Sequence, residues 1–246
     1  MSLAILPALI QHMLPQKVAR VAAHESAVAV DHLALDPGTR MVAAARELLA
    51  RSTDNQYMHV PDIEPSKGIF HADCSELIDY LTQQVDPKAL TDLPLDAGHP
   101  QPRAQDYYAY LHDRPDLAPG STPQGDWAQV GKPAALQPGD VIAWKNPDYV
   151  PHQSSTGHVM LVSELPKPVQ KNGAIVGYDV PIIDSTSHGH GPGDTRAPGQ
   201  TGLGQGTVYF PVDAQGAASG FSWTRSGAPN ALPPRPPMLA FGRLLK

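Results

Sequence analysis

The stretch GDVIAWKNPDYVPHQSSTGHVMLVS, residues 139–163, decides the fold. It holds two short apolar runs, Asp140–Trp144 and His158–Ser163, separated by a polar connection that contains proline and serine. Short runs rich in Val, Ile and aromatic residues are typical of β-strands. Further runs of this kind follow at Asp179–Asp184, Thr207–Val212 and Met238–Leu245. The second half of the chain therefore predicts a mostly antiparallel sheet.

The first half has the apolar spacing of helices instead, because its hydrophobic residues recur every three or four positions. The segments expected to be helical are 8–30, 38–51, 74–85 and a short patch at 105–112. Helices first and strands second predict an α+β fold with N-terminal helices packed on the sheet. We expect one domain over residues 1–246: a helical extension to residue 50, a core over 51–190, and C-terminal strands and loops over 191–246.

Composition excludes several classes of protein. The 246 residues carry 18 Lys and Arg against 24 Asp and Glu, a formal net charge of −6, which argues against a nucleic-acid-binding stripe. A single cysteine excludes an intramolecular disulfide framework and a cysteine-clustered zinc site. No apolar run is long enough to span a membrane as a helix. The 27 prolines and 21 glycines predict long, stiff connections.

The single cysteine, Cys74, stands in the string FHADCSELI, residues 70–78. Asp73 is expected to cap the helix that begins at Cys74. Backbone N–H groups and the dipole at a helix N-terminus stabilise an anion, and this lowers the pKa of a thiol. A reactive thiolate at Cys74 is thus the expectation, and an inert buried cysteine is the alternative.

Among the eleven histidines, His158 has a distinctive position, because it opens the strand GHVMLV. The turn LQPGDVI, residues 136–142, leads into the strand before it. Two adjacent strands would place the His158 imidazole at the sheet edge, where it could face the start of a packed helix. Cysteine and histidine would then form a nucleophile and its general base.

The strings DCS at residues 73–75, LQPGDV into Trp144, and GHV at 157–159 together resemble the NlpC/P60 cysteine peptidases, papain-like proteins related to CHAP amidases. The resemblance covers roughly residues 50–190. It implies an α+β fold with a helix on an antiparallel sheet, cleavage of peptide or amide bonds in bacterial cell-wall peptides, and no metal or organic cofactor. By position it implies Cys74 as nucleophile and His158 as base. The chain departs from the family in having Glu76 where glycine is usual and a longer interval between the two residues.

A base histidine needs a partner that fixes its tautomer and orientation. By the resemblance this residue lies on the next strand, where Asp184 follows two isoleucines; His188 is the second choice. Asn172-Gly173 predicts the hairpin between these strands. A strict two-residue turn would place Ser187 opposite His158, so Asp184 requires a bulge or a longer turn. Alternatively, Asp184 only caps a turn with Ser185.

Groups around the nucleophile complete the expected site. The Cys74 N–H is a candidate oxyanion donor. Tyr57 resembles the tyrosine that family members carry before the cysteine, with a core aromatic as the alternative. Asp73 and Ser75 flank the nucleophile as candidate substrate contacts, although the cap is favoured for Asp73. Residues 86–139 are expected to be mostly loop, and their aromatic residues could form a lid or a satellite core; these are Tyr107, Tyr108, Tyr110 and Trp127.

A metal site is the competing interpretation of the string HGHGPGD, residues 188–194. His188, His190 and Asp194 are ligand types that zinc accepts, with His152 as a further candidate. The favoured interpretation is a polar loop with an ion pair between Asp194 and Arg196, and no metal.

The leading hypothesis is a thiol hydrolase acting through Cys74, His158 and Asp184. A catalytically weak papain-like binding module and a thioester acyltransferase are the alternatives. The segment Leu3–Ile10 is short, broken by Pro7 and preceded by no basic residue, so it does not read as a signal peptide. The sequence itself leaves localisation open, and the resemblance implies the cell envelope or secretion.

Overall fold

The computed structural model describes residues 35–95, 99–117, 125–150, 155–228 and 238–246. The chain divides into two units, Met1–Asp36 and Pro37–Lys246. The helix expected over residues 8–30 lies outside the described residues, so the account below concerns the second unit. Among the residues described, no helix has the length and apolar character needed to cross a bilayer.

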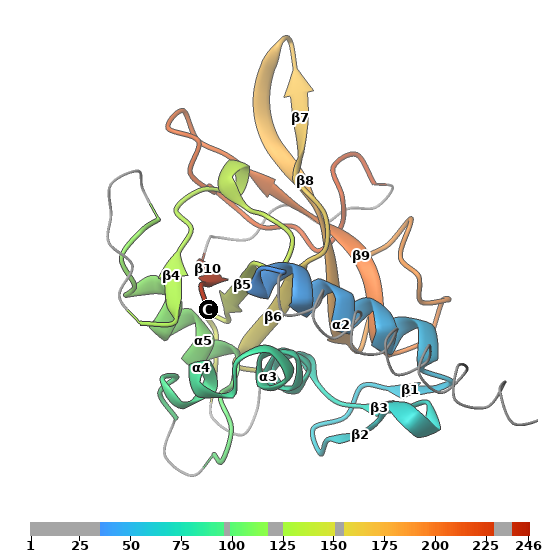
Figure 1. Cartoon of the computed structure of the whole chain (residues 1–246). Helices are drawn as coiled ribbons and strands as arrows, with labels where there is room; N and C mark the ends of the chain where they lie inside the picture. The colour runs from blue at the N-terminus through green and yellow to red at the C-terminus, as the bar shows by residue number, and fades with distance from the viewer. Residues whose placement is uncertain (1–34, 96–98, 118–124, 151–154, 229–237) are drawn as a thin grey trace, which may run out of the picture. The chain divides into compact units, whose positions relative to one another are not determined.

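An antiparallel sheet forms the centre of this unit (Figure 1). Its hydrogen-bonded order, in the part of the chain that the structure describes, is β4-β10-β5-β6-β8-β7, and β9 pairs with β8. The strands are β4 (Trp127–Gln129), β5 (Val141–Lys145), β6 (Gly157–Val162), β7 (Lys167–Lys171), β8 (Ala174–Thr186), β9 (Gly202–Pro211) and β10 (Leu239–Leu244). A smaller sheet has the order β1-β3-β2, from β1 (Asp54–Gln56), β2 (Asp62–Glu64) and β3 (Ile69–His71).

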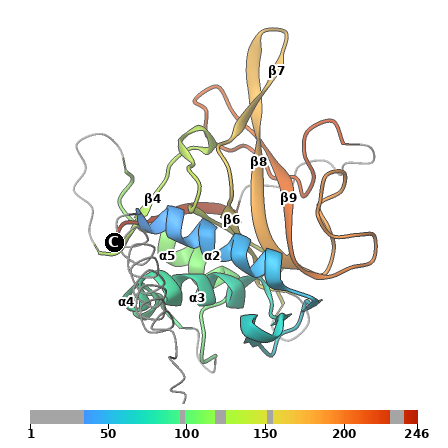
Figure 2. The same cartoon turned by 45° about the vertical axis from the view of Figure 1, so that its right-hand side comes forward.

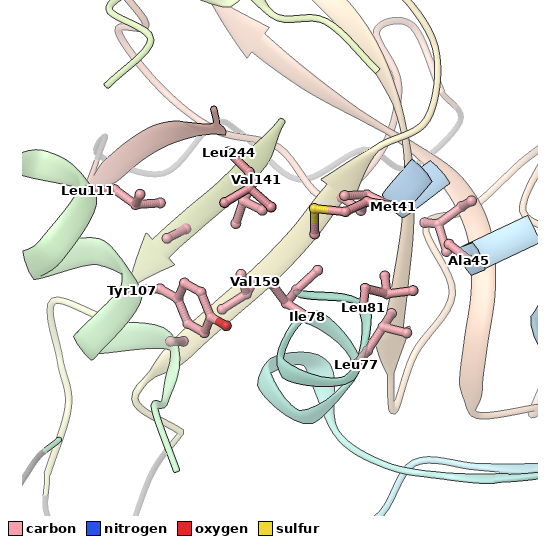
Figure 3. Close-up of a cluster of buried hydrophobic side chains, with 14 of the residues drawn as sticks. Met41, Ala45, Leu77, Ile78, Leu81, Tyr107, Leu111, Val141, Val159 and Leu244 are labelled. Atoms are coloured by element: carbon pink, nitrogen blue, oxygen red, sulfur yellow. The ribbon is translucent and has the colours of Figure 1, made fainter. Parts of the chain in front are cut away.

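The helices of the unit pack on one face of the large sheet (Figure 2). They are α2 (Pro37–Arg51), α3 (Cys74–Val85), α4 (Pro87–Thr91) and α5 (Ala104–His112), with short 3₁₀ turns at Pro65–Lys67 and Pro133–Ala135. Helix α2 contributes Met41 and Ala45 to the buried cluster in Figure 3, so it belongs to the main core although the sequence assigns most of it to an extension. The predicted α+β class, with a mostly antiparallel sheet, is confirmed.

Successive side chains along β6 point to opposite faces of the sheet, and the two faces pack against different clusters. Val159 and Leu161 join the cluster under the helices, whereas Met160 and Val162 join a second cluster with Phe210 on the opposite face. His158 shares the parity of Met160, so its side chain belongs to the face away from α3. Because it is the second residue of β6, it nevertheless lies at the end of the sheet.

The predicted turn at Asn172-Gly173 is present, with φ of 52° and 79° at its two residues. It joins β7 to β8 rather than the His158 strand to β8, so the predicted hairpin partner is wrong. No strand was expected at β7, because its residues are mostly polar and exposed. The hairpin extends beyond the rest of the sheet (Figure 1), and β8 continues from it to the site described below.

The segment 86–139, expected to be mostly loop with one short helix, contains that helix as α5 and also α4 and β4. Tyr107, Tyr110 and Trp127 are buried in the main core, so these three form neither a lid nor a separate satellite core. The Trp127 Nε1–H donates to the carbonyl of Ala89 at 3.1 Å. Residues 86–139 therefore contain short helices and a strand that their polar composition does not indicate. Buried aromatic side chains hold these elements against the core.

Candidate active site

Helix α3 begins with a complete capping box. The Asp73 Oδ1 accepts hydrogen bonds from the N–H groups of Ser75 (2.9 Å) and Glu76 (3.0 Å), and Glu76 Oε2 accepts from the Asp73 N–H at 2.7 Å. The predicted cap is therefore confirmed, and Glu76, the departure from the family pattern, is its second half. Ser75 also donates its hydroxyl to Asp73 Oδ1 at 2.8 Å, so the hydroxyl is engaged by the cap.

Cys74 occupies the first position of α3, and its side chain is buried. Burial raises the pKa of the thiol well above its ordinary value, and the Asp73 carboxylate raises it further. The backbone N–H groups of Val159 and Ser75 hydrogen-bond to the sulfur and oppose this shift. The expectation of a thiolate at neutral pH is therefore wrong for this structure, because desolvation outweighs the helix terminus.

The bond from Val159 also locates the sulfur. It places the Cys74 thiol against the residue that directly follows His158. In the described part of the chain no hydrogen bond joins the thiol to the His158 ring. Helix α3 packs on one face of β6 and the His158 side chain belongs to the other, so the structure brings both residues to the start of β6 without a hydrogen bond between them. Such contacts are often long in proteins without substrate and shorten when it binds.

His158 and Asp184 are in direct contact, with 2.5 Å between Nε2 and Oδ2. Leu161 pairs with Ile183 and Val162 with Ile182, a register in which Asp184 lies across from Met160. The carboxylate thus reaches the imidazole diagonally on one sheet face. This register differs by one residue from the one that a strict two-residue turn predicts, with Ser187 opposite His158. The alternative role of Asp184, a turn cap with Ser185, is not seen, because both residues lie within β8.

Asp184 is fully buried and carries several hydrogen bonds. Its Oδ2 also accepts from His190 Nε2 at 2.8 Å, and its Oδ1 accepts from Arg196 Nη2 at 2.8 Å. Burial alone would raise the pKa of Asp184, but the His190 ring and the hydrogen bonds from both imidazoles outweigh it and hold the pKa well below its usual range. The ionised carboxylate can only accept, so the facing nitrogen of each imidazole carries a proton.

The position of these protons determines which ring nitrogens of His158 and His190 can still accept a hydrogen bond. His190 Nδ1 lies 2.8 Å from the carbonyl oxygen of Trp223, which also only accepts, so His190 carries two protons and a positive charge. Burial lowers the pKa of His190, but its contacts with Asp184 raise it more. His158 Nδ1 makes no hydrogen bond to any described residue. Asp184 therefore leaves His158 with one ring nitrogen available for a thiol or a substrate.

The loop after β8 supplies the rest of this network. Arg196 contacts Asp194 through Nε (2.9 Å to Oδ1) and Nη2 (3.0 Å to Oδ2), which confirms the predicted ion pair. Its Nη1 donates to the carbonyl of Gly202 at 2.7 Å. The runner-up third residue, His188, is exposed and bonds only its neighbour Ser187 through its ring, so the structure does not bring it to His158.

His158, Asp184 and His190 together form a candidate metal-binding cluster. Ligand atoms of His158, Asp184 and His190 lie within 4.8 Å of one another. Two imidazoles and a carboxylate are a donor set that zinc accepts, and the His190 Nδ1–H bond to a carbonyl is typical of zinc-bound histidine. The predicted trio of His188, His190 and Asp194 does not form this cluster, and His152 lies outside the described residues.

Two candidate hydrogen-bond donors, the Cys74 N–H and the Tyr57 hydroxyl, belong to residues that line the same cavity. Ser75 and Glu76 give their N–H groups to the cap, whereas the Cys74 N–H bonds to no described residue. Tyr57 is half-buried, and burial is the largest cause that raises the pKa of its hydroxyl; the nearby acidic groups of Cys74 and Asp73 raise it further. The Tyr57 ring packs edge-on against His59 at 5.2 Å, so the alternative of a core aromatic does not hold.

Two cavities meet at the start of β6. One of about 590 Å³ is lined by Cys74, Asp73 and Ser75, and one of about 380 Å³ by His158, His190 and two tryptophans. Tyr57, Ser155, Gly157 and Ser187 line both. The wall at Gly157 is fixed, since its φ is +145° and an added Cβ would lie 1.9 Å from the Trp144 carbonyl oxygen.

Sequence reasoning missed three contributors to this site. His190 was considered only as a metal ligand and Arg196 only as a partner of Asp194, although both contact Asp184. Trp223 lines the smaller cavity, and nothing near it in the sequence indicates this. The role of Glu76 in the helix cap could have been predicted, because Asp-x-x-Glu before an apolar helix indicates a capping box.

Comparisons with known proteins leave the activity open. The "Uncharacterized protein R653" of Acanthamoeba polyphaga mimivirus is 27% identical over 199 residues, covering 73% of this chain and 83% of the relative. No family model matches the chain, and no solved structure matches it.

Proposed function

We propose that the protein is a papain-like cysteine hydrolase of the NlpC/P60 kind that cleaves peptide or amide bonds. The observation that carries the proposal is the contact of 2.5 Å between His158 and a buried, ionised Asp184, with the Cys74 sulfur against the next residue of the same strand. A nucleophile, a base and a group that orients the base are the three parts of a catalytic triad.

The proposed reaction starts from a protonated thiol. His158 Nδ1 takes the Cys74 proton as the sulfur attacks the carbonyl carbon, and Asp184 stabilises the imidazolium that forms. The Cys74 N–H and the Tyr57 hydroxyl donate to the developing oxyanion. His158 then protonates the leaving nitrogen, an acyl-enzyme remains on Cys74, and water releases it. The substrate class implied by the resemblance is a bacterial cell-wall peptide.

The test is digestion of purified cell-wall peptides by the protein and by Cys74→Ala, with products identified by mass spectrometry. We expect new fragments from the wild-type protein and none from the variant. Identical output from both would refute the hydrolase for this substrate class. Addition of an amine acceptor separates hydrolysis from acyl transfer, because an acyltransferase forms the acyl-amine product. A binding module would retain the peptides without new fragments.

A zinc-dependent hydrolase is the second candidate, favoured by the convergence of His158, Asp184 and His190. The two candidates make opposite predictions. A thiol hydrolase loses turnover in Cys74→Ala and keeps it after treatment with 1,10-phenanthroline. A zinc hydrolase keeps turnover in Cys74→Ala, loses it with the chelator and recovers it when Zn²⁺ is restored.

A further inference from the structure

We propose that the cavity beside His158 binds the leaving-group half of the substrate and favours an amine that carries a bulky aromatic or aliphatic side chain. The proposal rests on the proposed function, because it assigns the two cavities to the two halves of a cleaved amide. Trp223 is the residue that would determine this preference.

The direction of the substrate follows from proton transfer. The leaving nitrogen must receive its proton from His158, while the acyl carbon becomes bonded to the Cys74 sulfur. The leaving half therefore extends along the imidazole and the acyl half along the start of α3. Among the described residues, His158 lines only the cavity of about 380 Å³, and Cys74 lines only the one of about 590 Å³.

The smaller cavity has an aromatic wall, formed by the rings of Trp144, Trp223, His158 and His190. The Trp223 ring meets Trp144 edge-on at 5.7 Å and His158 edge-on at 5.0 Å, and it stacks on His190 at 5.8 Å. No Asp, Glu, Lys or Arg is among the described residues that line it, and the charged His190 ring is paired with the buried Asp184, whereas Asp73 and Arg103 line the larger cavity. Aromatic walls with few charges bind apolar groups.

The aromatic wall is held in place before any substrate arrives. The Trp223 carbonyl accepts from His190 Nδ1 at 2.8 Å. Its neighbour Ser222 exchanges two backbone hydrogen bonds with Tyr209 in β9, at 2.9 and 3.0 Å. A wall that needs no ordering on binding loses less entropy, so its contacts contribute more of their energy to selectivity.

Quenched peptides that differ only in the residue after the scissile bond test the preference. We expect kcat/KM for Phe or Leu at this position to exceed that for Gly by about 10- to 100-fold, the range that an apolar pocket supplies. Trp223→Ala should reduce this ratio by about tenfold or more, and Trp223→Phe should retain most of it. Leu165→Ala, an exposed side chain that does not line the site, should keep the wild-type ratio.

A binding measurement distinguishes failure of this proposal from failure of the proposed function. Titration calorimetry with Phe-Gly-amide and Gly-Gly-amide, the leaving halves themselves, is carried out on the wild-type protein, Cys74→Ala and Trp223→Ala. Tighter binding of the Phe compound to the first two proteins, and its loss in Trp223→Ala, supports the subsite even without turnover. Equal binding of both amides, or a cleavage ratio that Trp223→Ala leaves unchanged, overturns it.

Discussion

Asp184 is the side chain on which the orientation of His158 depends. Asp184→Asn keeps the size of the side chain but removes the charge that stabilises an imidazolium, so we expect kcat to fall by about 10²- to 10⁴-fold. Asp194→Asn is the matched control, because Asp194 also contacts Arg196 but makes no hydrogen bond to His158. Equal losses in both variants would show that the charge network, and not the imidazole contact, sets the rate.

The protonation of Cys74 gives a second prediction at this scale. A thiol with a raised pKa ionises only as the pH passes above its ordinary range, so alkylation by iodoacetamide should keep rising beyond pH 9 without a plateau. At pH 7 the substrate-free protein should react at least about tenfold more slowly than an unperturbed thiol. Asp73→Asn should speed the reaction, because asparagine still caps the helix but lacks the charge. A plateau below pH 8 would instead reveal a preformed thiolate.

At the scale of the element, the capping box fixes the start of α3 and hence the place of Cys74. Glu76→Gly removes the bond to the Asp73 N–H and adds the flexibility of glycine to the first turn, so we expect a loss of about 1–2 kcal/mol in unfolding free energy. Glu76→Gln is the control, since glutamine also completes a capping box. Chemical denaturation measures both. A Glu76→Gly variant as stable as wild type would exclude a structural role for this residue.

The sequence predicted the longer elements because their apolar periodicity is strong. Helices α2, α3 and α5 and strands β5, β6 and β10 were expected within a few residues, and the second halves of β8 and β9 were expected as well. The strands β1 to β4 and β7 are short or polar, so they lack the apolar periodicity that marks a strand in the sequence. Only β4 among them also pairs with a strand far along the chain, β10. Similarly, Asp184 follows two isoleucines and was predictable. His190 and Arg196 lie in a glycine-rich loop whose contacts no local pattern specifies.

At the scale of the whole molecule, a buried carboxyl links α3 to α5 and couples folding to pH. Tyr107 donates its hydroxyl to Asp79 Oδ1 at 2.6 Å, and burial raises the pKa of Asp79 to about 7. Because the folded protein holds this proton more tightly than the unfolded chain, Asp79 lowers stability as the pH rises from about 4 to 7. The lost stability does not return at higher pH.

Asp79→Asn should therefore stabilise the protein above pH 7, by about 1 kcal/mol or more, and make little difference below pH 4. The amide oxygen of asparagine can still accept from Tyr107. Tyr107→Phe is the counterpart, because it removes the donor and should increase the loss of stability at high pH. Melting temperatures between pH 4 and 8 measure these effects. A constant difference between Asp79→Asn and wild type at every pH would contradict the assignment.

β10, the last strand among the described residues, is an interior strand of the sheet. β10 lies between β4 and β5 and pairs with both. During synthesis β4 and β5 therefore leave the ribosome long before the strand that separates them, and until then each has an edge with unsatisfied backbone groups. Trp223 is also made after every member of the proposed triad. A nascent chain would thus carry the proposed nucleophile and base early, but the sheet that holds them closes only when β10 emerges.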